Sequence, residues 1–138
     1  MCGIFALLNS SQSYTEEYIY EEFMKGKNRG PEHSILQPEL NNYIIGFHRL
    51  AINGLNDESN QPLVLDNDLI LICNGEIYNY KELFKEIKVE PNTNSDCEII
   101  LHLYKKYGIS HTLKFLDGVF AFILIDMRVS KTQPIIFI

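Results

Sequence analysis

The 138-residue sequence lacks the motifs of several common function classes. Its three cysteines and four histidines are scattered, without Cys-x-x-Cys, His-Glu-x-x-His or a pair of histidines at helical spacing, so the sequence does not predict a zinc site. It contains neither a glycine-rich phosphate loop nor a dinucleotide fingerprint, and it therefore gives no sign of binding ATP. No run approaches the roughly 18 apolar residues that span a membrane. No basic run offsets the net charge of -6, which argues against a nucleic-acid partner.

The sequence also lacks a secretion signal and a disulfide framework. The apolar stretch 3–8 is too short for the core of a signal peptide, and polar residues follow it. Three cysteines are an odd number, which suggests a reducing compartment. The composition, 46% hydrophobic and 22% charged, is that of a soluble protein. We expect a cytoplasmic protein with one domain over residues 1–138.

Strand and helix patterns alternate along the chain without repeats. The apolar segment 119–125 has no polar face, so it predicts a strand that is covered on both sides. Ser95 to Glu98 matches a capping box for a helix with an apolar stripe at Ile99, Ile100, Leu103, Tyr104 and Tyr107. The other expected elements are strands at 3–9, 43–48, 69–73 and 118–126, and a helix from a Thr15 cap to about Lys27.

Cys2 directly follows the initiating methionine. Removal of Met1 would place a thiol and a free α-amine on one residue. An α-amine has an ordinary pKa of about 8, which is close enough to neutrality for it to take the thiol proton. The resulting thiolate suits attack on an amide or ester carbonyl. On this residue alone, however, a cysteine that stands second by chance is the favoured interpretation.

Asn74 and Gly75 follow the apolar run 69–73, at the point where a buried strand is expected to open into a loop. An asparagine amide and a glycine N–H held there can both donate hydrogen bonds to an oxyanion. An ordinary Asn-Gly turn is an equally good local interpretation. Cys73 and Cys97 need no chemical role, and burial as small apolar residues is expected for both.

Seven motifs in one order identify a family resemblance. They are Met-Cys-Gly-Ile at 1–4, Arg-Gly-Pro-Glu at 29–32, His-Arg-Leu at 48–50, Asn-Gln-Pro at 60–62, Asn-Gly-Glu-Ile-Tyr-Asn at 74–79, Ser-Asp-Cys-Glu at 95–98 and Asp-Gly-Val-Phe-Ala-Phe at 117–122. From residue 1 to about 126, the chain resembles the glutaminase domain of glutamine-hydrolysing asparagine synthetases. These domains are class II glutamine amidotransferases among the N-terminal-nucleophile hydrolases. The resemblance implies an α+β fold, a four-layer αββα sandwich of two antiparallel sheets flanked by helices.

The resemblance also implies residue roles. Cys2 would be the nucleophile that forms a γ-glutamyl thioester, with its own amine as base, and Asn74 and Gly75 would form the oxyanion hole. Arg49 would hold the α-carboxylate of L-glutamine and Asp96 its α-ammonium group. The implied substrate-binding set is Arg49, Leu50, Ala51, Ile52, Asn53, Asn74, Gly75, Glu76 and Asp96.

The chain departs from the family at its end. Family members continue beyond Asp126, complete the glutaminase domain and add a synthetase domain that uses ATP and magnesium. Here an apolar segment, 135–138, suited to one more strand, is the last. We therefore expect a C-terminally truncated glutaminase domain with an incomplete sheet and neither cofactor nor metal of its own. Smaller departures are Asn28 in place of the usual His and Glu32 in place of Asp.

The expected function is hydrolysis of L-glutamine to glutamate and ammonia for asparagine biosynthesis. Besides L-glutamine, the partners that this allows are a separate synthetase-domain chain and a second copy in a homodimer, with no nucleic acid and no membrane. The alternative is a non-catalytic remnant of an asparagine synthetase that binds glutamine or another protein. A truncated product that does not fold stably is a third interpretation.

Overall fold

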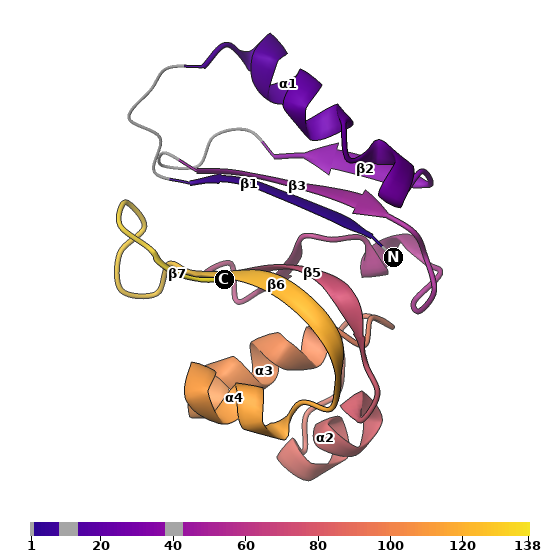
Figure 1. The fold of residues 1–138 in the computed structure, drawn as a ribbon. Helices are drawn as coiled ribbons and strands as arrows, with labels where there is room; N and C mark the ends of the chain where they lie inside the picture. Colours follow the sequence, from indigo (N-terminus) through magenta and orange to yellow (C-terminus); the bar gives the residue numbers. More distant parts are fainter. Residues whose placement is uncertain (1, 9–13, 38–42) are drawn as a thin grey trace.

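The computed structural model describes residues 2–8, 14–37 and 43–138. Figure 1 shows four layers: α1 lies over the first sheet, the two sheets face each other, and α2, α3 and α4 lie against the second sheet. The predicted α+β sandwich is confirmed. The elements are β1 (Gly3–Leu8), α1 (Glu16–Met24), η1 (Lys27–Arg29), β2 (His33–Leu36), β3 (Tyr43–Arg49), η2 (Asp57–Ser59), β4 (Leu63–Leu65), β5 (Leu69–Ile77), α2 (Tyr80–Ile87), α3 (Glu98–Tyr107), α4 (Ile109–Phe115), β6 (Gly118–Asp126) and β7 (Ile135–Phe137).

The first sheet has the order β1-β3-β2, and both of its pairings are antiparallel. In the register of β1 against β3, Gly3 lies opposite His48, and so Cys2 lies beside the end of β3. The predicted strand 3–9 is confirmed up to Leu8, and Asn9 lies outside the described residues. This sheet therefore brings the chain start to Arg49 and the loop that follows it.

The second sheet has the order β4-β5-β6-β7. β5 and β6 are both nine residues long and pair along their whole length, from Leu69 opposite Asp126 to Ile77 opposite Gly118. The prediction that the strand opens into a loop at Asn74 is therefore wrong, and so is the alternative of an Asn-Gly turn. Pairing with the equally long β6 outweighs the local turn preference. The last apolar segment does form a strand, β7.

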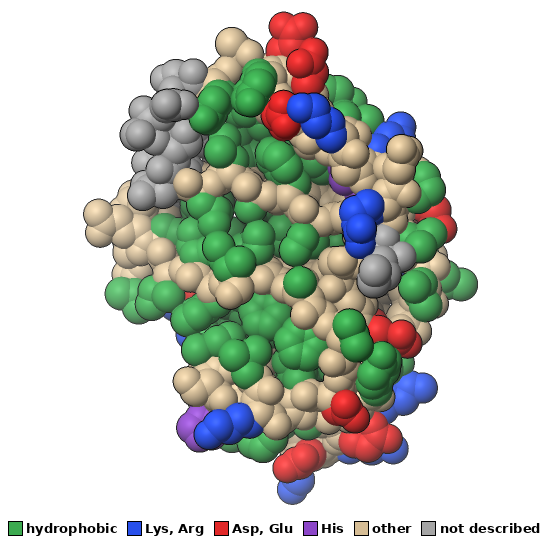
Figure 2. Space-filling view, in the orientation of Figure 1, with side chains coloured by type: hydrophobic (Ala, Val, Ile, Leu, Met, Phe, Trp, Pro, Cys, Tyr) green, Lys and Arg blue, Asp and Glu red, His purple; other side chains and the backbone are tan. Residues whose placement is uncertain are grey.

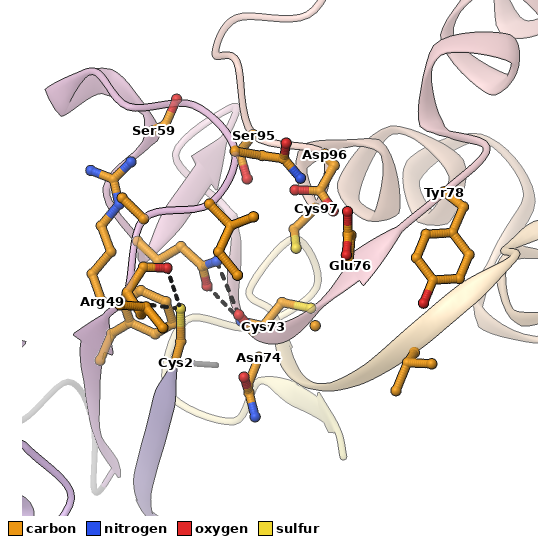
Figure 3. A pocket seen from close by; sticks show the side chains of 18 residues that line it. Cys2, Arg49, Ser59, Cys73, Asn74, Glu76, Tyr78, Ser95, Asp96 and Cys97 are labelled. Carbon is orange, nitrogen blue, oxygen red and sulfur yellow. Dashed lines mark hydrogen bonds between the residues drawn. The ribbon is translucent and has the colours of Figure 1, made fainter. Parts of the chain in front are cut away.

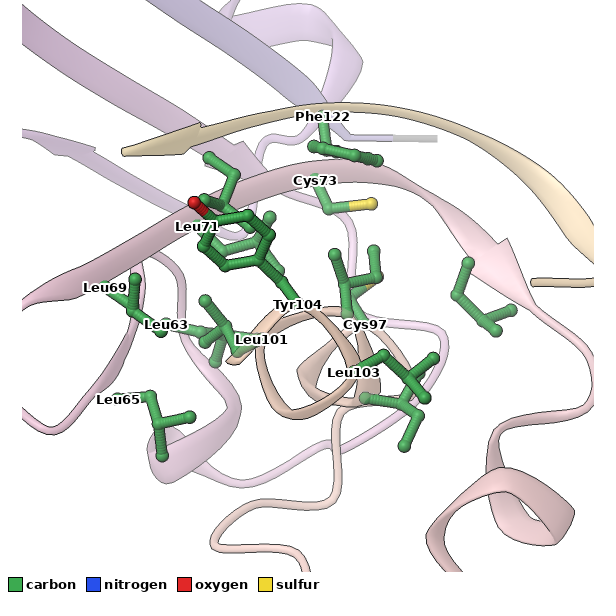
Figure 4. Packing of buried hydrophobic residues seen from close by; sticks show 14 of the residues in the cluster. Leu63, Leu65, Leu69, Leu71, Cys73, Cys97, Leu101, Leu103, Tyr104 and Phe122 are labelled. Carbon is green, nitrogen blue, oxygen red and sulfur yellow. The ribbon is translucent and has the colours of Figure 1, made fainter. Parts of the chain in front are cut away.

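Two apolar cores lie on opposite faces of the second sheet. Ile123 and Ile125 of β6 face the core between the sheets, whereas Phe122 and Leu124 face the core beneath the helices. The expected cover on both sides of this strand is confirmed. Figure 4 shows the helix-side core, and Figure 2 shows hydrophobic side chains between the layers at one edge of the sandwich. No described helix is both long and apolar enough to cross a membrane.

The helix ends confirm one predicted cap and contradict another. Thr15 caps α1, because its Oγ1 accepts from the N–H of Tyr18 at 3.2 Å, although α1 ends at Met24 rather than near Lys27. The capping box is wrong: α3 begins at Glu98, and the residue at its N-cap, Cys97, forms no side-chain cap bond.

Glu98 departs from the capping box because its buried carboxylate has other donors. It accepts from the backbone N–H groups of Asn92 and Thr93, each at 2.7 Å, and lies 2.9 Å from Nε2 of His102. Burial raises the pKa of Glu98, but the hydrogen bonds from His102, Thr93 and the backbone outweigh it, so the net pKa is lowered. The predicted apolar stripe of α3 is buried except for Tyr107.

Asp126, at the end of β6, allows a prediction about acid stability. Its carboxylate accepts from Nε and Nη2 of Arg128 at 3.0 and 2.7 Å and from the hydroxyl of Tyr104 at 2.6 Å. Chiefly through the hydrogen bonds from Arg128, the pKa of Asp126 falls to about 2 from 3.8. A carboxyl group with a lowered folded-state pKa stabilises the fold above its unfolded pKa, and this contribution is lost as the pH falls through the folded value.

We expect Asp126→Asn to lower the free energy of unfolding by about 2 kcal/mol at pH 7. The deficit relative to the wild type should shrink as the pH falls from 4 towards 2. Urea unfolding of both proteins across this range measures it. A deficit that stays constant with pH would show that the ionised carboxylate is not its source.

Candidate active site

A cavity of about 310 Å³ lies between the end of β3, β5 and the residues before α3. All ten predicted site residues line it, so the structure brings together segments that are far apart in sequence. Figure 3 shows its side chains. The lining residues are Cys2, Phe47, Arg49, Leu50, Ala51, Ile52, Asn53, Ser59, Gln61, Cys73, Asn74, Gly75, Glu76, Tyr78, Ser95, Asp96, Cys97 and Val119.

The thiol of Cys2 lies against the first residue after β3. Its Sγ is 3.4 Å from both the backbone N and the backbone O of Leu50. Nε of Arg29 donates to the carbonyl of Cys2 at 3.1 Å. Glu32 holds the same loop, since its Oε2 accepts from the N–H of Ala51 at 2.9 Å. The Arg-Gly-Pro-Glu motif therefore fixes both Cys2 and the loop that it contacts.

Arg49 is a buried cation bound by neutral groups. Its guanidinium is 7% exposed and donates to the carbonyl of Gly54, the carbonyl of Asn56 at 3.2 Å and Oδ1 of Asn60 at 2.5 Å. No described carboxylate forms a salt bridge with it. Because a guanidinium has five N–H groups, Nε–H and one hydrogen of Nη2 are left over.

Asp96 is a buried anion on the opposite side of the view in Figure 3. Its Oδ2 accepts from the N–H of Ile77 at 2.7 Å. Within the described segments it has no salt-bridge partner. The start of α3, two residues on, favours a negative charge here. The cavity therefore contains one buried charge of each sign, and neither has a protein counter-ion among the described residues.

Asn74 and Gly75 lie side by side on β5 at the cavity wall. Oδ1 of Asn74 is, among the described residues, the buried side-chain polar atom without a hydrogen-bond partner. A Cβ on Gly75 would lie 2.4 Å from the carbonyl oxygen of Val119, so this close approach of β6 requires glycine. An unsatisfied buried amide beside an exposed glycine backbone is an arrangement suited to binding a ligand.

The other two cysteines of the cavity are buried, as expected, at 1% and 3% exposure for Cys73 and Cys97. A hydrogen bond with Cys73, together with burial, raises the pKa of Cys97 well above its ordinary value. The Cys97 thiol therefore stays protonated at neutral pH and is a poor nucleophile. Cys2 is the partly exposed thiol of the three.

Sequence analysis missed eight of the lining residues. Gln61 is the most informative, because its side chain binds the backbone of Cys73 through both of its polar atoms. Its motif, Asn-Gln-Pro, was recognised without any role for the glutamine. The others are Phe47, Ser59, Cys73, Tyr78, Ser95, Cys97 and Val119, which carry no sequence signal of their own.

Comparison with known proteins places this cavity in a family. Residues 1–134 match the model of the glutamine amidotransferase domain. The chain is 42% identical over 140 residues to the asparagine synthetase [glutamine-hydrolyzing] of Mesocricetus auratus and 40% identical to that of Homo sapiens, in each case over 95% of this chain and 24% of the relative. It is 39% identical to asparagine synthetase [glutamine-hydrolyzing] 1 of Arabidopsis thaliana, over 93% of this chain and 22% of the relative. The chain spans about a quarter of the length of these curated relatives. It belongs to the glutamine amidotransferase domain family.

Proposed function

We propose that the chain hydrolyses L-glutamine to glutamate and ammonia through Cys2, and that the ammonia serves asparagine synthesis. The observation that carries the proposal is the pair of uncompensated buried charges, Arg49 and Asp96, in one cavity with a cysteine thiol. Buried charges are normally paired. A free amino acid supplies one group of each sign and so completes both pairs. The printed names of the relatives, glutamine-hydrolysing asparagine synthetases, support glutamine as that amino acid.

The proposed binding mode uses the donors and acceptors that the protein leaves free. Nε–H and the remaining hydrogen of Nη2 lie along one side of the Arg49 guanidinium and suit two parallel bonds to the α-carboxylate. Oδ1 of Asp96 would accept from the α-ammonium group, since Oδ2 already accepts from Ile77. Glu76, on the same wall, would add a second negative group near the ammonium.

The proposed reaction begins after Met1 is removed. The α-amine of Cys2 takes the thiol proton, and the thiolate adds to the γ-carbonyl carbon of glutamine. The negative charge passes to the carbonyl oxygen, which would accept from the N–H of Gly75 and from Nδ2 of Asn74 after a half-turn of its amide. Ammonia leaves with the proton held by the amine, and a thioester remains. Water then attacks the thioester, which releases glutamate and restores the thiol.

A substrate comparison tests the charge pairing. We expect release of ammonia from L-glutamine, and at least about ten-fold lower kcat/KM for glutaramate, which lacks the α-amine. Intact mass should first establish that Met1 is absent. Equal rates with both compounds would contradict the proposed role of Asp96, and no ammonia from either would contradict the proposed function.

Asp96→Asn should raise the KM for L-glutamine by about 10- to 100-fold, because a hydrogen bond between charged groups is lost from a buried site. The same variant should largely lose the preference for L-glutamine over glutaramate. Steady-state kinetics on both compounds measures this. Asp66→Asn is a matched control, because Asp66 forms an exposed ion pair with Lys105 outside the cavity. Equal KM increases in the two variants would sink the assignment.

A further inference from the structure

The edge of β5 that faces the cavity is completed by side chains rather than by a strand. β4 pairs with β5 only from Leu65 opposite Leu69 to Leu63 opposite Leu71. Beyond Leu71, the side chain of Gln61 takes the place of a strand: its Oε1 accepts from the N–H of Cys73 at 2.5 Å, and its Nε2 donates to the carbonyl of Cys73 at 3.0 Å. A side-chain amide thus reproduces the two bonds of one antiparallel residue pair.

Alternation along the strand gives the next positions on this edge. In an antiparallel sheet, the N–H and C=O of every second residue point to the same side. Cys73 points to Gln61, and the N–H of Ile77 points to the carboxylate of Asp96. Gly75 lies between them on the same edge, so its N–H points into the cavity. Gln61 and Asp96 therefore flank the backbone donor proposed to bind the oxyanion.

Gln61 suits this position through its length and its neutral amide. It is 7% exposed, and both of its polar atoms are bound to one residue, so its side chain is held firmly. A carboxylate in its place would keep an acceptor for the N–H of Cys73 but would place a negative oxygen against the carbonyl. Methionine has a similar length but provides neither bond.

We propose that Gln61 is a positioning residue for the oxyanion hole, acting through Cys73, the residue directly before Asn74 and Gly75. The inference rests on the proposed glutaminase function. Donors must lie about 2.7–3.1 Å from the oxygen that becomes charged, and a shift of about 1 Å costs on the order of 100-fold in rate. Releasing Cys73 frees the segment that carries both donors, while Cys2, Arg49 and the α-ammonium site stay in place.

The test compares Gln61→Met and Gln61→Glu with the wild type and with Gln133→Met, a control at an exposed glutamine outside the cavity. We expect Gln61→Met to lower kcat for L-glutamine by about 30- to 100-fold with KM changed less than about three-fold. Alkylation of Cys2 by iodoacetamide should stay within about two-fold, because displacement of iodide uses no oxyanion donor. Amide hydrogen exchange at Cys73 should accelerate at least about ten-fold.

Gln61→Glu keeps one of the two bonds, so we expect a smaller fall in kcat, with KM again unchanged. This variant carries the test if Gln61→Met does not fold. An active wild type with unchanged kcat in both variants would overturn the inference alone. Loss of kcat together with equal losses in alkylation and in glutamine binding would also overturn it, because it would indicate general disruption. A wild type that is folded, free of Met1 and inactive would instead remove the proposed function on which the inference rests, whereas unchanged exchange at Cys73 would remove its structural basis.

Discussion

Cys2→Ala should reduce glutamate release from L-glutamine by at least about 10⁴-fold, because it removes the proposed nucleophile of both chemical steps. The methyl group fills part of the space of the thiol, and the two contacts of Sγ with Leu50 are long at 3.4 Å, so the fold should tolerate the change. Steady-state assays of glutamate release measure the loss. Calorimetry should still detect binding of L-glutamine by the variant, because Arg49 and Asp96 remain.

The matched control is Cys97→Ala, which removes a different thiol from the wall of the same cavity. The pKa of Cys97 is raised well above its ordinary value, so this thiol is protonated and should contribute no nucleophile. We expect Cys97→Ala to keep activity within about ten-fold, the loss coming from the space left in a packed region. Equal losses in Cys97→Ala and Cys2→Ala would contradict the assignment of Cys2.

Asn74→Ala should lower kcat for L-glutamine by about 10²- to 10³-fold, with KM changed only a few-fold. The unsatisfied amide of Asn74 is expected to gain its hydrogen bond when charge develops on the substrate oxygen, and not before. Asn74→Asp should be at least as damaging, because a carboxylate repels the oxyanion.

Asn92→Ala, at an exposed asparagine outside the cavity, is the control for this series and should leave both kinetic constants nearly unchanged. The contrast of kcat and KM is the informative measurement. A raised KM with an unchanged kcat would move Asn74 from the transition state to ground-state binding of glutamine.

Much of the fold follows from sequence patterns. The unbroken apolar run in β6 predicts a strand between two layers, and both faces of β6 are indeed covered. Thr15 followed by acidic residues predicts the start of α1 correctly. These signals are local, because the side chains that matter lie a few residues apart on one element.

Two errors arose where distant residues decide the structure. Asn74-Gly75 has the local preference of a turn, yet β6 holds it in extended conformation over the full length of β5. Glu98 has the spacing of a capping box, yet its carboxylate binds the backbone N–H groups of Asn92 and Thr93. Tertiary partners outweigh local propensity in both cases.

The cavity shows the same division between motif and contact. Its predicted residues came from a family resemblance, and the structure brings all of them to one wall. What the sequence cannot give is the pairing of Gln61 with the backbone of Cys73, because a buried glutamine and a surface glutamine look alike in a sequence. The uncompensated charges of Arg49 and Asp96 are likewise visible only once the neighbours of each are known.

The most direct test of the account is the mass of the protein after brief reaction with L-glutamine and quenching in acid, which preserves thioesters. The account predicts a covalent adduct with the mass of glutamine less ammonia, located on the peptide that begins with Cys2 and absent from Cys2→Ala. Glutamate release without any such adduct, or an adduct on Cys73 or Cys97, would contradict it.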